Sequence, residues 1–450
     1  MRTIDRGRLA ERLAAEERLF RDEHRRSRSL FERAQRSQLA GVPMSWMARW
    51  AGGFPVYVAE GSGARFRDVD GHEYVDLCLG DTGAMTGHAP PASVEAIVAQ
   101  ARHGITFMLP SEDGIVVAEE MQRRFGLPYW QFCLTATDAN RFALRLSRQV
   151  TGRPWVLVMN GCYHGTVDES FVWLENGVAR ARDGNVGPKV DPTRTTRVVE
   201  FNDLPALERA LAPRDVACVL LEPAMTNIGI IHPDPGYHAA LRELTRRTGT
   251  LLVVDETHTL CCGPGGFTAA HGLAPDVLTM GKPLAGGVPA AAYGLSAEFA
   301  QRALAHKSVL ESDTNGIGGT LAGNALSLAA MRATLERVLT AEAFARTIPL
   351  AERWARGVAE VIERRELAWN VTRLGCRGEY WFCPTPARNG SQAAAAIDVD
   401  LDRYMHLATL NRGILLTPFH MMALVAPQTT AADIDLHTRV FEECVAQLLD

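Results

Sequence analysis

An aspartate and a lysine each follow a short apolar run in this chain, and residues of these two types can perform covalent chemistry together. Asp255 ends the run TLLVVD (250–255), and Lys282 follows DVLTMG (276–281). At the edge of a desolvated site, a lysine amine gives up its proton readily and can condense with an aldehyde. An acid held nearby can keep a heterocyclic nitrogen protonated, which makes the ring an electron sink.

A third segment could hold a phosphate group. In LTATDAN (134–140) an apolar strand ends, and Thr135, Ala136 and Thr137 open a helix whose first turn carries Asp138. Small residues at a helix N-terminus let backbone N–H groups approach an anion, although this segment alone is more typical of an ordinary helix cap. A lysine, an acid and a phosphate cradle are the three features that pyridoxal 5'-phosphate (PLP) needs.

The surrounding pattern predicts a parallel sheet that would position these residues. Between about residues 93 and 345, helical patterns such as 138–151 and 234–248 alternate with short apolar strands, expected at 155–160, 196–201, 216–223, 250–255 and 276–281. Continuous apolar strands that alternate with helices indicate a parallel sheet covered on both faces. Ligands of such sheets bind beyond the carboxyl ends of the strands. Glu222 and Asp255 lie at such strand ends, and Lys282 directly follows another one.

The chain length predicts more than one compact part. Its 450 residues exceed what one hydrophobic core usually serves. We expect an amphipathic helix and a β-ribbon with an Asp-Gly hairpin signal in residues 1–75, a large α/β domain in residues 76–345, and a small α+β domain in residues 346–450. Near the C-terminus, Thr430 and Asp433 have the spacing of a capping box, which predicts the start of a terminal helix.

Composition argues against several classes of function. A charged content of 22% and a hydrophobic content of 47% are typical of a soluble globular protein, and a net charge of −5 gives no reason to expect nucleic acid or a membrane surface as a partner. No apolar run approaches the roughly 18 residues that span a bilayer, and the N-terminus resembles neither a secretion signal nor a transit peptide. The nine cysteines include no C-x-x-C pair, which favours reduced thiols in a cytoplasmic protein with neither a disulfide framework nor a metal site.

Six short motifs occur in an order and at a spacing that carry a family resemblance. They are TATDA (135–139), Tyr163-His164-Gly165, EPAMTN (222–227), DETHT (255–259), Gly281-Lys282 and GTLAGN (319–324). With these motifs, the chain resembles the class III aminotransferases of PLP fold type I from about residue 41 to its C-terminus. The resemblance is greatest to the branch that contains glutamate-1-semialdehyde aminomutase and the β-amino-acid aminotransferases.

The resemblance implies a fold, a cofactor and a set of residue roles. The fold is a large domain with a mostly parallel seven-stranded sheet sandwiched by helices, plus a small α+β domain from the N- and C-terminal segments. PLP would form an imine with Lys282, which would later shuttle the substrate proton. The remaining roles would be phosphate binding by Thr135, Ala136 and Thr137, contact with the pyridine nitrogen by Asp255, packing on the two ring faces by Tyr163 and Thr257, and bracing by Glu222 and Asn227. Thr320 would reach the phosphate of the neighbouring subunit's cofactor, so the active unit would be a homodimer.

Several positions depart from the family pattern. His258 stands where some members place a glutamine that reaches the 3′ oxygen of the cofactor, so it either tunes the cofactor or only packs beside the site. The aminomutase branch uses a C-terminal glutamate, and Met422 occupies its place, which argues against glutamate-1-semialdehyde as the substrate. The β-amino-acid branch has an arginine in the same loop, where this chain has Phe419 and His420.

Further candidate substrate residues lie nearer the N-terminus. Ser45 and Arg49 fall in MSWMARW. Arg49 lies one residue beyond the family's carboxylate-binding arginine, so it either binds a carboxylate or stacks on Trp46 or Trp50 at the surface. Asp81 replaces a common aromatic residue, and it could attract a second amine or hydroxyl on the substrate or pair with Arg49.

We expect a homodimeric PLP-dependent aminotransferase that moves an amino group from a small-molecule donor to a keto acceptor in a ping-pong cycle. The apolar loop from Phe419 to Met422 favours a substrate with an uncharged or aromatic side. Within the same cofactor class, a PLP-dependent aminomutase or an amino-acid racemase is the alternative. From another class, the chain could be a catalytically degenerate scaffold homologue, which the intact Asp255 and Lys282 argue against.

Overall fold

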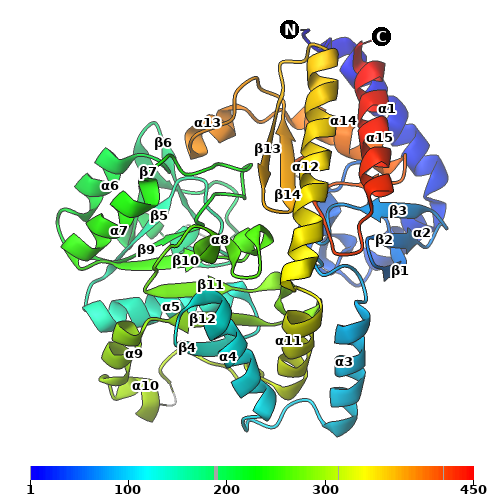
Figure 1. The fold of residues 1–450 in the computed structure, drawn as a ribbon. Helices are drawn as coiled ribbons and strands as arrows, with labels where there is room; N and C mark the ends of the chain where they lie inside the picture. The colour runs from blue at the N-terminus through cyan, green and yellow to red at the C-terminus, as the bar shows by residue number, and fades with distance from the viewer. Residues whose placement is uncertain (1, 187–190, 313, 419, 450) are drawn as a thin grey trace. The chain divides into compact units, whose positions relative to one another are not determined.

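The computed structural model describes residues 2–186, 191–312, 314–418 and 420–449, and the chain divides into two compact units (Figure 1). Unit 1 comprises Met1–Pro90, Glu342–Pro386 and Ala396–Asp450, and unit 2 comprises Pro91–Ala341 and Ala387–Ala395. The expected α/β fold, with a smaller part assembled from both chain ends, is confirmed.

Unit 2 contains a seven-stranded sheet. Its strands are β4 (Tyr129–Cys133), β5 (Trp155–Met159), β8 (Thr196–Val199), β9 (Val216–Leu221), β10 (Leu251–Asp255), β11 (Val277–Met280) and β12 (Ala291–Leu295). The strand order is β4-β12-β11-β10-β9-β5-β8, in which β12 runs antiparallel to both its neighbours and the other pairs are parallel. β9 and β10 are buried along their whole lengths, as their continuous apolar runs predict.

Helices cover the sheet of unit 2, and a short hairpin is added beside it. The helices are α3 (Pro91–His103), α4 (Glu112–Phe125), α5 (Ala136–Thr151), α6 (Leu204–Leu211), α7 (Tyr237–Thr248), α8 (Gly266–Ala270), α9 (Ala297–Leu304), α10 (Ser308–Glu311), α11 (Ala325–Arg337) and α13 (Gly390–Ala395). The hairpin pairs β6 (Val172–Glu175) with β7 (Val178–Ala181). Helix α5 packs across β4, β9, β11 and β12, whereas α6 and α7 pack against β8 and β10 (Figure 1).

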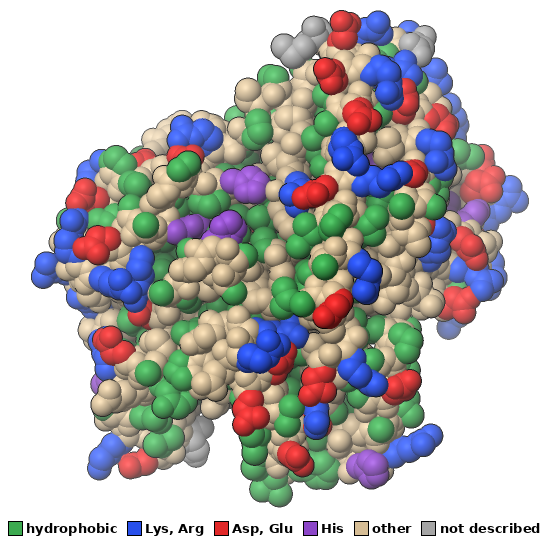
Figure 2. Space-filling view, in the orientation of Figure 1, with side chains coloured by type: hydrophobic (Ala, Val, Ile, Leu, Met, Phe, Trp, Pro, Cys, Tyr) green, Lys and Arg blue, Asp and Glu red, His purple; other side chains and the backbone are tan. Residues whose placement is uncertain are grey.

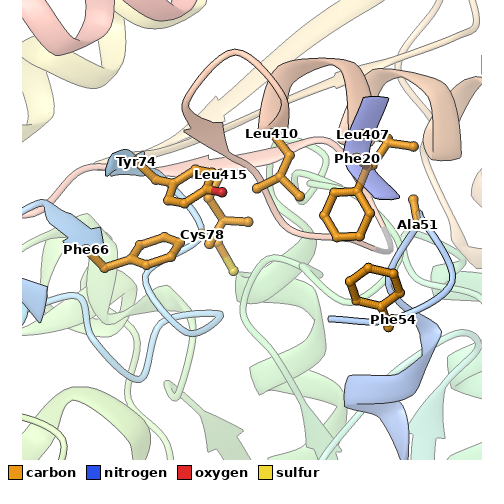
Figure 3. Packing of buried hydrophobic residues seen from close by; sticks show 9 residues of the cluster. All are labelled: Phe20, Ala51, Phe54, Phe66, Tyr74, Cys78, Leu407, Leu410 and Leu415. Carbon is orange, nitrogen blue, oxygen red and sulfur yellow. The ribbon is translucent and has the colours of Figure 1, made fainter. Parts of the chain in front are cut away.

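Unit 1 joins helices to two small sheets. One sheet contains β1 (Val58–Ser62), β2 (Arg65–Asp68), β3 (Glu73–Asp76) and β15 (Ile414–Leu415), and the other contains β13 (Asn370–Leu374), β14 (Arg377–Trp381) and β16 (Met422–Leu424). The helices are α1 (Arg6–Glu23), α2 (Arg25–Ala34), α12 (Ala341–Arg364), α14 (Val399–Leu410) and α15 (Ala431–Leu449). Figure 3 shows part of the core, in which Phe20, Ala51, Phe54, Phe66, Tyr74 and Cys78 pack with Leu407, Leu410 and Leu415 from the other end of the chain.

The single N-terminal helix expected from the sequence is divided in two. α1 ends at Glu23 and α2 begins at Arg25, because His24 between them has a non-helical backbone with φ −111°. The His24 ring is buried, and its Nδ1 lies 2.8 Å from the carbonyl oxygen of Phe20. The break therefore places a polar ring inside unit 1, which helical spacing in the sequence does not reveal.

Two local predictions for unit 1 are confirmed. The Asp-Gly pair at 70–71 forms the turn between the antiparallel strands β2 and β3. At the start of α15, the Thr430 N–H donates to the Asp433 carboxylate at 2.9 Å, and the Asp433 N–H donates to the Thr430 hydroxyl at 3.3 Å. These reciprocal bonds are those of a capping box.

Charges of both signs are mixed over the face that Figure 2 shows. This agrees with the near balance between 47 basic and 52 acidic residues in the chain. Within the described part of the chain, no helix combines the length and the apolar character needed to cross a membrane.

Candidate active site

The candidate residues of unit 2 lie where five strands of its sheet end. The segment opening with Thr135 follows β4, Tyr163 follows β5, Glu222 follows β9, Asp255 ends β10, and Lys282 lies two residues after β11. The five strands point the same way, because β12 is antiparallel to β4 as well as to β11. Their carboxyl ends therefore meet at one edge of the sheet, where ligands of such folds bind.

Asp255 is buried and held by three hydrogen-bond donors. His164 Nδ1 lies 2.9 Å from Asp255 Oδ2, and the Asn140 side-chain amide donates to the same oxygen at 2.8 Å. The backbone N–H of Thr257 donates to Oδ1 at 3.0 Å. Asn140 is itself fixed, because it accepts a hydrogen bond from the Thr279 hydroxyl at 2.6 Å. The Asp255 carboxylate at the end of β10 is thus oriented by α5 and by the loop after β5, and β11 holds Asn140 in turn.

These contacts keep Asp255 ionised. Burial alone would raise the pKa of Asp255, but the hydrogen bond and charge of His164, with help from Thr257 and Asn140, lower it from 3.8 to about 2. Burial also opposes a charge on His164, but interaction with Cys162 and the hydrogen bond to Asp255 raise the pKa of the ring from 6.5 to about 10. The two residues therefore form a buried ion pair at neutral pH.

The predicted phosphate segment forms the N-terminus of α5. The Thr135 side chain caps the helix by accepting from the Asp138 N–H at 3.1 Å. The Thr137 hydroxyl accepts from the N–H of Thr166 at 3.0 Å, which ties the loop after β5 to this turn. The residues of this turn are exposed or half-buried and begin a 16-residue helix, whose N-terminus favours an anion.

Gly281 lets the lysine turn approach this helix start. A Cβ on Gly281 would lie 2.9 Å from the backbone nitrogen of Ala136, closer than real side chains come. The residue next to the candidate lysine therefore packs directly against the candidate phosphate loop. This close approach, together with an ionised carboxylate at Asp255, fits a cofactor that carries a phosphate and a basic ring nitrogen.

Lys282 and His258 are in direct contact. The distance from Lys282 Nζ to His258 Nε2 is 2.9 Å, and both side chains are half-buried. Lys282 has φ 51°, a left-handed backbone that is uncommon for residues other than glycine and is concentrated at functional sites. His258 thus contacts the predicted reactive amine, and its part in tuning the cofactor stays a prediction.

The remaining predicted cofactor residues differ in exposure. Tyr163 and Thr320 are exposed, whereas Thr257 and Glu222 are buried. Glu222 accepts a hydrogen bond from the Thr226 hydroxyl, and Asn227 donates to the carbonyl oxygen of Gly161 at 3.1 Å. The Glu222–Asn227 segment thus braces the loop that carries Tyr163.

The roles of two residues in unit 2 were not predicted from the sequence. Asn140 and His164 orient Asp255, yet they lie 115 and 91 residues away from it in the chain. Asn140 ends the segment LTATDAN, and His164 lies within the motif Tyr163-His164-Gly165. Their place in these motifs pointed to a role at the site, but only the fold shows that they contact Asp255.

The candidate substrate residues of unit 1 fall into two groups. Ser45 and Arg49 are exposed on a short 3-10 helix, Ser45–Arg49. Asp81, His420 and Met422 belong to a second group that also contains Arg377 and Glu379, two residues that sequence reasoning missed. Phe419 lies outside the described residues.

This second group contains two ion pairs around β14. Arg377 Nη2 lies 3.3 Å from Asp81 Oδ1, with the arginine fully buried and the aspartate side chain 36% exposed. His420 Nδ1 lies 2.8 Å from Glu379 Oε1, and the strand pairing sets Glu379 opposite Met422. Arg377 is thus one partner of Asp81, and the sequence did not suggest it.

The backbone around Asp81 is strained. Leu79, Asp81 and Thr82 have φ values of 46°, 49° and 83°, and Gly80 between them has φ 58°. Left-handed conformations are unfavourable for such residues, above all for a β-branched threonine, and they cluster at functional sites. The loop that presents Asp81 is therefore held in place by its surroundings.

Comparison with known proteins places the chain in a family. A family model described as aminotransferase class-III matches residues 46–445. The chain belongs to the class III aminotransferase family. Members of this family use PLP, and the geometry of unit 2 fits that cofactor.

Similar proteins belong to the glutamate-1-semialdehyde aminomutase branch of the class III family, which the motifs indicated. The chain is 34% identical over 440 residues to a glutamate-1-semialdehyde 2,1-aminomutase of Chloroflexus aggregans, and the match covers 95% of this chain and 99% of that protein. A crystal structure of a glutamate-1-semialdehyde-aminomutase from Pseudomonas aeruginosa PAO1 is 49% identical, with a TM-score of 0.97 and 99% of both chains covered. A lysine-to-alanine variant from the same organism, in complex with PMP, is 48% identical with the same TM-score and coverage.

Proposed function

We propose that this chain is a PLP-dependent aminomutase, which moves an amino group between two carbons of one substrate. The observation that carries the proposal is similarity over nearly the whole chain to proteins named as aminomutases, at 34% and 49% identity. These relatives favour isomerisation over the intermolecular transfer that the motifs alone suggested. Intermolecular transfer becomes the second candidate.

The residues of unit 2 would divide the chemistry among them. Bound PLP supplies an electron sink for the substrate carbon that loses a proton. Lys282 would hold the cofactor and carry this proton on Nζ, with His258 Nε2 at 2.9 Å as the partner that shares it. Asp255 would keep the pyridine nitrogen protonated, because His164 and Asn140 hold the carboxylate ionised and fixed.

Other residues would bind and orient the cofactor. Thr135, Ala136 and Thr137 would bind its phosphate at the start of α5, and Tyr163 and Thr257 would pack on its ring faces. Glu222 and Asn227 would act indirectly, since Asn227 is bonded to Gly161 just before Tyr163. These roles follow from the family pattern and agree with the contacts in unit 2.

We also propose a homodimer in which Thr320 reaches the partner's cofactor. Near this residue, the segment 105–109 and Leu321 leave large apolar side chains exposed, with Phe107 53%, Met108 77% and Leu109 74% exposed. The two segments are joined, because the Ala325 N–H donates to the Ile105 carbonyl at 3.0 Å. A group of exposed apolar side chains of this kind is typical of a protein interface.

The substrate is proposed to carry a second amino or hydroxyl group, which Asp81 binds. Asp81 is partly exposed, and the buried Arg377 pairs with its carboxylate. Ser45, Arg49, His420 and Met422 stay predictions as substrate residues. Met422 supports the second candidate, since it replaces the glutamate of the aminomutase branch and is fully buried in β16.

An isotope experiment separates the candidate reactions. The PLP-loaded enzyme is incubated with ¹⁵N-labelled amino aldehydes, namely glutamate-1-semialdehyde and a derivative with an added hydroxyl group, without any added amino acceptor. An aminomutase transfers the label to the neighbouring carbon, which nitrogen and carbon NMR detect. A racemase leaves the label on its carbon with inverted configuration, and an aminotransferase turns over only after a keto acid is added. Either of these last results contradicts the proposal.

A further inference from the structure

A compact group of polar side chains lies in unit 1 and includes none of the residues assigned above. His24 stands between α1 and α2, Asp68 ends β2, and His72 follows in the β2–β3 turn. His24 Nε2 lies 3.5 Å from Asp68 Oδ2, and His72 Nδ1 lies 3.1 Å from the same oxygen. One ligand atom from each residue lies within 4.8 Å of the other two.

Two of these side chains are oriented by contacts on their far sides. The Phe20 carbonyl oxygen can only accept, so His24 Nδ1 at 2.8 Å carries a hydrogen, and Nε2 of the neutral ring presents a lone pair toward Asp68. Asp68 Oδ1 accepts from three backbone N–H groups, those of residues 70, 71 and 72, at 2.8 to 2.9 Å. Its Oδ2 is thereby directed at both rings. Such outer contacts are typical of side chains that hold a metal ion.

The hydrogen bonds within the group can accommodate one more positive charge. The Tyr74 hydroxyl lies 2.7 Å from His24 Nε2 and 2.8 Å from Asp68 Oδ2. A single hydroxyl proton can serve only one of these two acceptors. A cation between Nε2 and Oδ2 would satisfy both, because Nε2 would bind the cation and Tyr74 would donate to the carboxylate.

We propose that His24, Asp68 and His72 bind one divalent transition-metal ion of the Zn²⁺ class. A tetrahedral site with bonds of about 2.0 Å has ligand atoms about 3.3 Å apart, and the two distances to Asp68 Oδ2, 3.5 and 3.1 Å, lie on either side of that value. Two imidazoles and one carboxylate are ligands that zinc accepts, with a water in the fourth position. The ion would join the α1–α2 junction to the β2–β3 hairpin.

Glu23 supports His72 as the third ligand. Its carboxylate Oε2 lies 3.7 Å from His72 Nε2, on the side of the ring away from Asp68. When Nδ1 binds a metal, Nε2 carries the ring hydrogen, and a carboxylate near it strengthens the ligand. His72 is the accessible member of the group, with 34% of its side chain exposed, so an ion can enter there.

Zinc titration of the PLP-loaded enzyme tests this site without reference to activity. After chelator treatment, calorimetric titration with zinc sulfate should show one Zn²⁺ bound per chain and a rise in the thermal unfolding temperature. His72→Ala should weaken zinc binding at least ~10-fold and abolish the temperature rise. The matched variant His103→Ala removes an exposed histidine at the end of α3 and should bind as the wild type does.

Cobalt gives an independent readout of the ligands. Co²⁺ added to the metal-free holoenzyme should produce a visible absorption band that His72→Ala lacks and His103→Ala retains. The inference is overturned if His72→Ala binds zinc as tightly as the wild type. It is also overturned if the wild type binds no more zinc than His72→Ala does. A proton on His24 would then take the place of the cation.

Discussion

At the scale of single residues, the environment of Asp255 matters as much as its identity. A carboxylate at the end of a buried strand would ordinarily favour its neutral form, because burial penalises the charge. Three donors and the charge of His164 reverse this preference and lower the pKa of Asp255 to about 2. The acid that faces the cofactor nitrogen in our proposal is thus ionised throughout the pH range in which an enzyme works.

The Asp255–His164 pair should give the apoenzyme a pH-dependent stability. The lowered pKa of Asp255 contributes stability that is present above its ordinary value of 3.8 and is lost as the pH falls toward about 2. The raised pKa of His164 contributes stability that is complete below 6.5 and is lost as the pH rises toward about 10. His164→Asn keeps a donor without the charge. Its unfolding temperature should therefore fall furthest below that of the wild type between pH 3.8 and 6.5, and the difference should shrink toward pH 10. A difference that stays constant with pH would contradict the ion pair.

Asp81 should decide how well the substrate's second polar group binds. Asp81→Asn removes the charge but keeps the size, so KM for a substrate with that group should rise by about 10-fold or more, while kcat changes little. For an analogue that lacks the second amino or hydroxyl group, variant and wild type should have the same KM in steady-state assays. Equal losses with both compounds would show that Asp81 serves only the local structure.

At the scale of elements, the site depends on how closely the β11–lysine turn approaches the start of α5. The sequence allowed both elements to be predicted, because a capped helix start and a buried strand are local patterns. It did not allow prediction of the contact between Gly281 and Ala136, or of the pair formed by Arg377 and Asp81, which are 296 residues apart. Such contacts depend on the packing of distant elements, which local patterns leave open.

Filling the space at Gly281 should weaken cofactor binding. In Gly281→Ala the new Cβ would meet the Ala136 nitrogen at 2.9 Å and displace the phosphate loop, so the Kd for PLP should rise by about 10-fold, as expected for 1–3 kcal/mol of overpacking. Gly114→Ala, inside α4, is the matched control. Its new Cβ would make an ordinary 3.4 Å contact with the Leu328 side chain. Fluorescence titration of the apoproteins with PLP measures both. Equal affinities for the two variants would refute the tight contact.

At the scale of the whole molecule, unit 1 is assembled from both ends of the chain. The N-terminal α1 and Phe20 pack with Leu407 and Leu410 of α14, so the two ends share one core (Figure 3). The family resemblance implied this assembly, whereas residue patterns alone suggested separate N- and C-terminal segments. The mixed charges on the surface agree with the near balance of basic and acidic residues, whereas the exposed apolar side chains at 105–109 became visible only in the fold.

Those apolar side chains should hold two copies of the chain together. Met108→Glu places a charge in the exposed apolar group, and it should shift the protein from dimer to monomer in sedimentation velocity at micromolar concentration. Val399→Glu is a matched control, because Val399 is also exposed, at 62%, and opens α14, where an acid is tolerated. Dimers that survive Met108→Glu unchanged would place the interface elsewhere.

The site of covalent attachment tests the central claim most directly. The chain contains three lysines, Lys189, Lys282 and Lys307. The PLP-loaded protein is reduced with borohydride, digested and analysed by mass spectrometry, with Lys282→Ala and Lys307→Ala treated in parallel. We predict the cofactor mass on the peptide that contains Lys282, its retention in Lys307→Ala and its loss in Lys282→Ala. A cofactor adduct on another lysine, or no adduct on the wild type, would contradict the account.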